Sequence, residues 1–76
     1  MEIQKFIEHF AEQFEDTELS EFKPETNFRE LDEWSSIIAL SVIAMVDEEY
    51  DISLKGDDVR GATTIEDLFN TVKSKL

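Results

Sequence analysis

The most apolar stretch of the sequence reads Ser36-Ile-Ile-Ala-Leu-Ser-Val-Ile-Ala-Met-Val-Asp-Glu-Glu-Tyr50. Neither Gly nor Pro interrupts it, and Ser35 or Ser36 can cap its start, so it predicts a helix over residues 36–50. At about 100° per residue, one face gathers side chains that should meet a core: Ala39, Val42, Ile43, Val46 and Tyr50. The opposite face carries Ile37, Ile38, Ser41, Ala44, Met45 and Glu48. That second face is too apolar for an ordinary solvated surface.

Apolar residues at helical spacing predict one further helix toward each end of the chain. The first covers about 3–15 and is marked by Ile3, Phe6, Ile7, Phe10 and Phe14. The last covers about 65–75 and is marked by Ile65, Leu68, Phe69, Val72 and Leu76. Its start fits a capping box, either Thr63 with Glu66 or Thr64 with Asp67. One short helical turn is expected near 57–60.

Residues 16–35 lose the helical period and form a long loop, which is unusual in so small a domain unless it is tied down. Phe28 and Leu31 are expected to plug the bundle where the loop crosses it. The predicted fold is therefore an all-α small helical bundle with three main helices and one short helix. Residues 1–76 form one domain.

Charge and composition exclude several classes of function. The 76 residues hold 7 Lys+Arg against 19 Asp+Glu, which gives a net charge of −12. Such a chain is a poor ligand for nucleic acid and for anionic membranes. With no Cys and one His, it lacks disulfides, thiol catalysis and the usual zinc ligands. No export signal or membrane-spanning run is visible, so we expect a cytoplasmic monomer without membrane insertion.

Three other patterns that could indicate a functional site are better explained as ordinary surface residues. Paired carboxylates need a desolvating cleft for acid–base catalysis, and a chain of this size has little volume for one. An EF-hand pattern starting at Asp47 fails, because Ile52 stands where Gly is required and Asp58 where Glu is required. His9 lies off the apolar stripe of its helix and is expected to be solvated. We therefore expect no catalytic residues and no metal site.

The informative segment is Trp34-Ser35-Ser36-Ile37, where the long loop enters the central helix. A hydroxyl at a helix start is commonly only a cap. Alternatively, a serine here could carry a phosphodiester, which would meet free backbone N–H groups and the positive end of the helix dipole. No His or Lys lies nearby in sequence to activate the hydroxyl as a catalytic nucleophile.

The order of these parts resembles the acyl carrier protein family over nearly the whole chain. The family motif Asp-Ser-Leu corresponds to Ser35-Ser36-Ile37, and Phe28-Arg-Glu-Leu31 matches the family's Phe-x-x-Leu approach. The family's aromatic residue at the end of this helix follows its modified serine by fourteen positions, and Tyr50 follows Ser36 by the same number. The resemblance therefore implies that Ser36, rather than Ser35, is the modified serine.

The resemblance implies that Ser36 carries covalent 4'-phosphopantetheine, transferred from coenzyme A by a phosphopantetheinyl transferase. The arm's thiol would hold acyl intermediates as thioesters in fatty-acid, polyketide or related lipid and secondary-metabolite biosynthesis. Partners would include an acyl-activating ligase or acyltransferase and ketosynthase-type enzymes. Trp34 differs from the commonest family sequence, and we expect it to anchor the loop, although it could instead touch the arm.

The chain also departs from the family on the exposed side of the central helix, where acidic residues are usual. Ile38 and Ser41 replace two of them, while Asp47 and Glu48 remain. We therefore predict a partner-binding surface that relies on apolar contact. Its residues are Ile37, Ile38, Ser41, Ala44, Met45, Asp47 and Glu48.

Two alternatives stay open. An aminoacyl or peptidyl carrier would share the same attachment chemistry. An unmodified acidic protein-interaction domain would use Ser36 only as a helix cap. An enzyme in its own right is the least supported interpretation.

Overall fold

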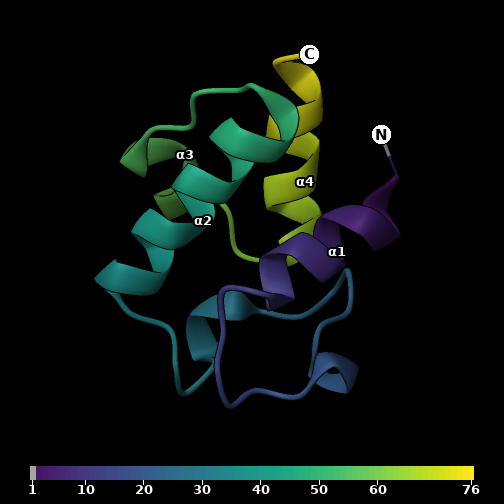
Figure 1. Ribbon diagram of the computed structural model, residues 1–76, viewed down its shortest axis with the longest axis vertical. Coiled ribbons are helices and arrows are strands. Elements are labelled where there is room, and N and C mark those ends of the chain that lie inside the picture. The colour runs from purple at the N-terminus through teal and green to yellow at the C-terminus, as the bar shows by residue number, and fades with distance from the viewer. Residues whose placement is uncertain (1) are drawn as a thin grey trace.

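The computed structural model describes residues 2–76 and consists of helices joined by loops (Figure 1). The helices are α1 (Ile3–Ala11), α2 (Ser36–Tyr50), α3 (Gly56–Arg60) and α4 (Ile65–Ser74). Two short 3-10 turns, η1 (Leu19–Glu21) and η2 (Phe28–Glu30), lie in the long loop. The predicted all-α bundle of three longer helices and one short helix is confirmed.

The four helices close around one core of apolar side chains. α1 packs against α2 and α4, and α3 packs against the same two helices. The largest side chains with no solvent exposure are Phe6, Phe10, Phe28, Val42, Val46, Ile65, Leu68 and Val72. Aromatic contacts bind the helices together, and the rings of Phe6 and Phe69 meet edge to face with centroids 5.6 Å apart.

α1 ends at Ala11, four residues before the predicted boundary. The chain tightens there into shorter turns, in which Gln13 N–H donates to the Phe10 carbonyl and Phe14 N–H donates to the Ala11 carbonyl. Phe14 nevertheless remains buried and packs on Phe22 with ring centroids 4.9 Å apart. The apolar period therefore marked the buried residues correctly but overestimated the length of the helix.

The long loop is ordered because it supplies hydrogen-bond acceptors as well as apolar side chains. Phe28 is buried in the core and Leu31 packs against it, as predicted. The Pro24 carbonyl accepts from Glu66 N–H at 2.9 Å, and the Thr26 carbonyl accepts from Ile65 N–H at 3.1 Å. These bonds satisfy two N–H groups that the first turn of any helix leaves free. The loop thus fixes the start of α4.

A side-chain capping box completes the same helix start. The Thr64 hydroxyl accepts from Asp67 N–H, while the Asp67 carboxylate accepts from the N–H groups of Thr64 and Thr63, each at 3.1 Å. The bond from Thr64 N–H is the main cause that lowers the pKa of Asp67 below its ordinary value, and the bond from Thr63 N–H adds to it. Of the two predicted boxes, the one formed by Thr64 and Asp67 is therefore present.

The face of α2 that was predicted to be exposed is partly covered. Met45 is only 5 % exposed and belongs to the core, and Ile38 is half-buried against it. The reason is that α2 packs on both α1 and α3, so its buried arc is wider than a helix lying on a single neighbour would need. The predicted core face itself is confirmed: Val42 and Val46 are buried, and Ala39, Ile43 and Tyr50 pack partly buried against the core.

His9 also differs from expectation, because it is half-buried rather than solvated. Its ring lies edge-on to Tyr50 with centroids 6.0 Å apart. Its Nε2 is 3.8 Å from a carboxylate oxygen of Glu49. The cause is the position of Tyr50 at the end of α2, which brings a large ring against the side of α1.

Candidate functional site

The two serines at the start of α2 have different local roles. Ser35 is the N-cap: its backbone is extended, and its hydroxyl accepts from Ile38 N–H at 3.3 Å. Ser36 is the first helical residue and is exposed. Its hydroxyl makes no hydrogen bond within residues 2–76. The cap is thus supplied by Ser35, and the hydroxyl of Ser36 is free to react.

The start of α2 is suited to a negatively charged group. The N–H groups of Ser36 and Ile37 have no acceptor within the described part of the chain. The first turn of this fifteen-residue helix contains no acidic side chain, whereas the first turns of α3 and α4 each contain two. Free N–H groups and the positive end of the helix dipole both favour an anion here. A phosphodiester on Ser36 therefore fits the local electrostatics.

A groove of about 520 Å³ lies between α2 and α3 and opens beside this serine. It is lined by Arg29, Trp34, Ser35, Ser36, Ala39, Leu40, Ile43, Gly56, Val59 and Arg60. Apolar side chains of the two helices, such as Ile43 and Val59, supply much of this lining. A flexible amphipathic group attached to Ser36 could therefore lie along an apolar surface without entering the core.

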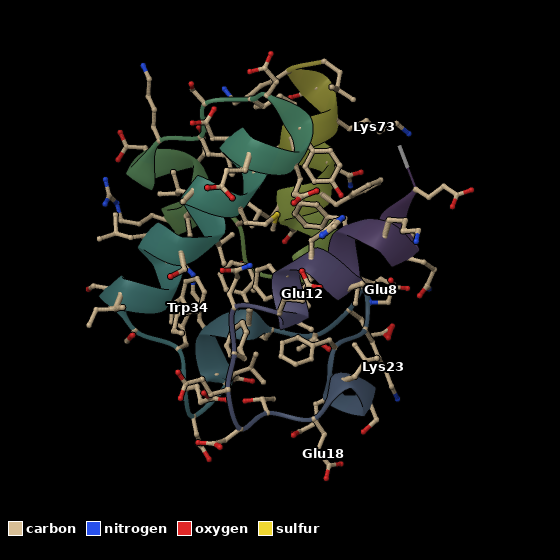
Figure 2. The ribbon with its side chains drawn as sticks, in the orientation of Figure 1. Glu8, Glu12, Glu18, Lys23, Trp34 and Lys73 are labelled. Carbon is tan, nitrogen blue, oxygen red and sulfur yellow. The ribbon has the colours of Figure 1, made fainter. Side chains whose placement is uncertain are left out.

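Trp34 fixes the approach of the loop to this groove. Its ring is 4.7 Å from that of Phe28, centroid to centroid, and stacks on Phe10 at 6.4 Å with a 10° angle between the planes. Figure 2 shows Trp34 beneath the first turns of α2, between that helix and the loop. The predicted anchoring role of Trp34 is confirmed. The same residue also lines the groove, so anchoring and contact with an occupant are compatible.

Glu33, directly before Trp34, ties the loop to the chain that follows α1. Its carboxylate accepts from Glu15 N–H at 3.0 Å, from Asp16 N–H at 2.9 Å and from the Thr17 hydroxyl. The bond from Thr17 is the main cause that lowers the pKa of Glu33 below its ordinary value, and the backbone N–H groups add to it. The segment that positions Ser36 is thus held on one side by aromatic stacking and on the other by a carboxylate clamp.

The predicted contact residues divide into exposed and covered groups. Ile37 is 75 % exposed, and Ala44, Asp47 and Glu48 are exposed as well. Ser41 and Ile38 are half-buried, and Met45 is excluded from any contact surface by its burial. Sequence reasoning missed Leu40, which is 66 % exposed. Its spacing of three from Ile37 and four from Ser36 was the signal that could have identified it.

The structure places neither a hydrogen-bonded base nor a cluster of metal-binding side chains beside Ser36 in the described residues. Within residues 2–76 the hydroxyl of Ser36 has no hydrogen-bonded base, and nucleophilic catalysis by serine requires one. No cluster of three or more His, Asp or Glu side chains able to hold a metal ion occurs in this part of the chain.

The family model described as phosphopantetheine attachment site matches residues 4–72. The chain belongs to this family. The match spans all four helices except the first residue of α1 and the end of α4, and it includes Ser36 and every residue that lines the groove. A phosphopantetheine attachment domain is a carrier that bears covalent 4'-phosphopantetheine and works with a phosphopantetheinyl transferase and partner enzymes.

Two further comparisons add nothing to this assignment, since neither the curated proteins nor the solved structures gave a significant match. Within the described residues of this carrier domain, none of the helices has the length and apolar character that a bilayer crossing requires.

Proposed function

We propose that this chain is an acyl carrier protein in which residues 1–76 form one carrier domain and Ser36 bears the 4'-phosphopantetheine. The observation that carries the proposal is the free, exposed hydroxyl of Ser36 at the first position of α2, beside N–H groups without acceptors. Ser35 is a poorer acceptor because its hydroxyl is engaged as the helix cap. Modifying Ser35 would remove that cap.

In the loading reaction, the Ser36 oxygen forms a bond to the phosphorus of coenzyme A that carries the pantetheine. The bond from that phosphorus to the leaving 3',5'-ADP breaks, and the hydroxyl proton passes to a base of the transferase. The chain's own contribution is to present the oxygen and to stabilise the resulting anion through the N–H groups of Ser36 and Ile37. When bound, the group supplies a thiol that holds an acyl group as a thioester, which the cysteine-free chain cannot do itself.

The partner surface in this proposal is the exposed side of α2 near the serine. Ile37 and Leu40 are on consecutive turns and are among the most exposed large apolar residues of the described chain. Ala44, Asp47 and Glu48 continue this side toward the end of the helix. We expect a transferase, an acyl ligase or acyltransferase, and ketosynthase-type enzymes of a cytoplasmic lipid or polyketide pathway to approach here.

The proposal is tested by intact mass. The purified protein is incubated with coenzyme A and a broad-specificity transferase, together with Ser36→Ala and Ser35→Ala variants. We expect the wild type and Ser35→Ala to gain one phosphopantetheine each and Ser36→Ala to gain none. If Ser36→Ala gained a phosphopantetheine, the attachment residue would have to be another one. No gain by the wild type with several transferases would favour an unmodified interaction domain.

The class of cargo is tested separately with purified ligases. Loading of fatty or hydroxy acids would support acyl carriage. Loading of an amino acid alone would replace the proposal with an aminoacyl carrier that uses the same serine.

A further inference from the structure

Both arginines of the chain line the groove beside Ser36. The protein as a whole is strongly acidic, with a net charge of −12, and a quarter of its residues are Asp or Glu. None of the ten residues that line the groove is acidic. The lining of the groove therefore combines two basic side chains with apolar ones, and the nearest carboxylate is that of Asp57, which pairs with Arg60.

Arg29 is held in place by the backbone across the groove. Its Nη2 donates to the carbonyl of Val59 at 3.1 Å and to that of Arg60. These bonds join η2 to the end of α3 and occupy only one nitrogen of the guanidinium. Because a guanidinium carries five N–H donors in a rigid plane, the others are fixed in position without a partner within residues 2–76.

Arg60 folds back over the start of its own helix. It pairs with Asp57 through Nη2, and its guanidinium crosses above Gly56, where an added Cβ would lie 3.2 Å from Nη1. Gly56 is thus the residue that leaves room for this arrangement. The guanidinium remains exposed at the α3 wall of the groove, which is the side opposite Ser36 on α2.

In the proposed modification, the N–H groups at the start of α2 are available to donate hydrogen bonds to the phosphodiester at Ser36. The two guanidinium groups line the same groove: Arg29 has N–H donors without a partner within residues 2–76, and Arg60 is exposed with only the surface carboxylate of Asp57 beside it. Together they complement a second anion. A flexible arm attached to Ser36 can fold back and bring its cargo to them.

We propose that this groove receives an acyl cargo that carries a carboxylate, with its hydrocarbon chain on Ala39, Ile43 and Val59 and its anion at Arg60 and Arg29. This inference rests on the proposed attachment at Ser36. It names a substrate class, carboxylate-bearing acyl groups, that attachment alone does not specify.

The test compares three forms of the protein, each loaded by a transferase from the matching coenzyme A derivative. One carries the bare arm, one carries an octanedioyl group with a free carboxylate, and one carries its neutral methyl ester. In every case Ser36 gains the whole arm and 3',5'-ADP leaves. Mass spectrometry establishes loading first, so a failed attachment is distinguished from a failed cargo preference.

We expect the carboxylate form to melt about 2–4 °C above the methyl ester form, the size of effect a small domain shows for one exposed ion pair. Arg60→Gln should abolish this difference. The matched control is Lys55→Gln, which removes the same charge from an exposed residue outside the groove and should leave the difference intact. Because each variant is compared with itself, its own stability change cancels.

A second readout uses the side-chain Nε–H signals of the two arginines in ¹⁵N spectra. The carboxylate form should shift both signals relative to the methyl ester form. Equal melting temperatures and unshifted signals would overturn the proposal. So would an equal response of all three loaded forms to Arg60→Gln, because the arginines would then serve the phosphodiester.

Discussion

The two ends of α2 place apolar side chains in opposite surroundings. At its start, Ile37 and Leu40 project into solvent, and in Figure 1 this end stands at the left edge of the molecule, away from α1 and α4. At its other end, Val46 is fully buried and Tyr50 contacts Phe6 with ring centroids 6.0 Å apart. Burial stabilises the second end, whereas exposure at the first end contributes nothing to folding.

The buried end also shows what the fold tolerates. Within the described residues the buried hydroxyl of Tyr50 has no hydrogen-bond partner, and the buried Nδ1 of His9 lies 3.5 Å from a carboxylate oxygen of Glu12. Burial raises the pKa of Tyr50, and the charge of Glu49 adds to the effect. Packing thus outweighs polar satisfaction at this end. At the exposed end, large apolar side chains lie in solvent and do not pack in the core, which is typical of a contact surface.

The largest effect should separate two residues that the helical wheel put on one face. Met45→Ala should lower the free energy of unfolding by about 2–4 kcal/mol, because it leaves a cavity in the core. Ile37→Ala should change it by less than about 0.5 kcal/mol, since its side chain is exposed. Urea unfolding followed by circular dichroism measures both. Equal effects would remove the distinction between the two ends.

The exposed end should matter for partners rather than for stability. Ile37→Lys and Leu40→Lys should leave the unfolding midpoint nearly unchanged and slow acyl transfer by a partner enzyme about tenfold, the loss expected for one apolar contact residue. Asn70→Lys, at an exposed position of α4 outside this surface, serves as the control for added charge. If neither Ile37→Lys nor Leu40→Lys changed the rate of acyl transfer, a contact role for this surface would be disproved.

The helix cap should contribute less to the free energy of unfolding than the core does, and it should not affect partner binding. Ser35→Ala should lower stability by about 1 kcal/mol, the usual cost of losing a serine N-cap. Ser36→Ala should cost little, because its hydroxyl caps nothing. Thermal melts of the unmodified forms compare the two, and a larger loss in Ser36→Ala would reverse the assigned roles.

The smallest expected effect concerns how the stability of the protein changes at acidic pH. The pKa of Glu33 is lowered in the folded protein, chiefly by the Thr17 hydroxyl. Its contribution to stability is therefore fully present above the ordinary glutamate pKa of about 4.3 and is lost as the pH falls through the lower folded value. Glu33→Gln should reduce the urea midpoint at pH 7 and shrink the drop on acidification. Glu30→Gln, which removes a carboxylate without hydrogen bonds in the described chain, should do neither.

The sequence by itself predicted the three longer helices, two candidate capping boxes and, through the family resemblance, Ser36 as the proposed attachment residue, because these predictions depend on local spacing and short-range hydrogen bonds. The bounds of α2 and the buried positions of Phe28 and Val46 follow from such patterns. Only the tertiary structure decided that Met45 is buried while Leu40 is exposed, since that depends on which neighbours cover α2. It also decided that Arg29 and Arg60, thirty-one residues apart, meet at one groove. Such a meeting is set by long-range packing and leaves no trace in local spacing.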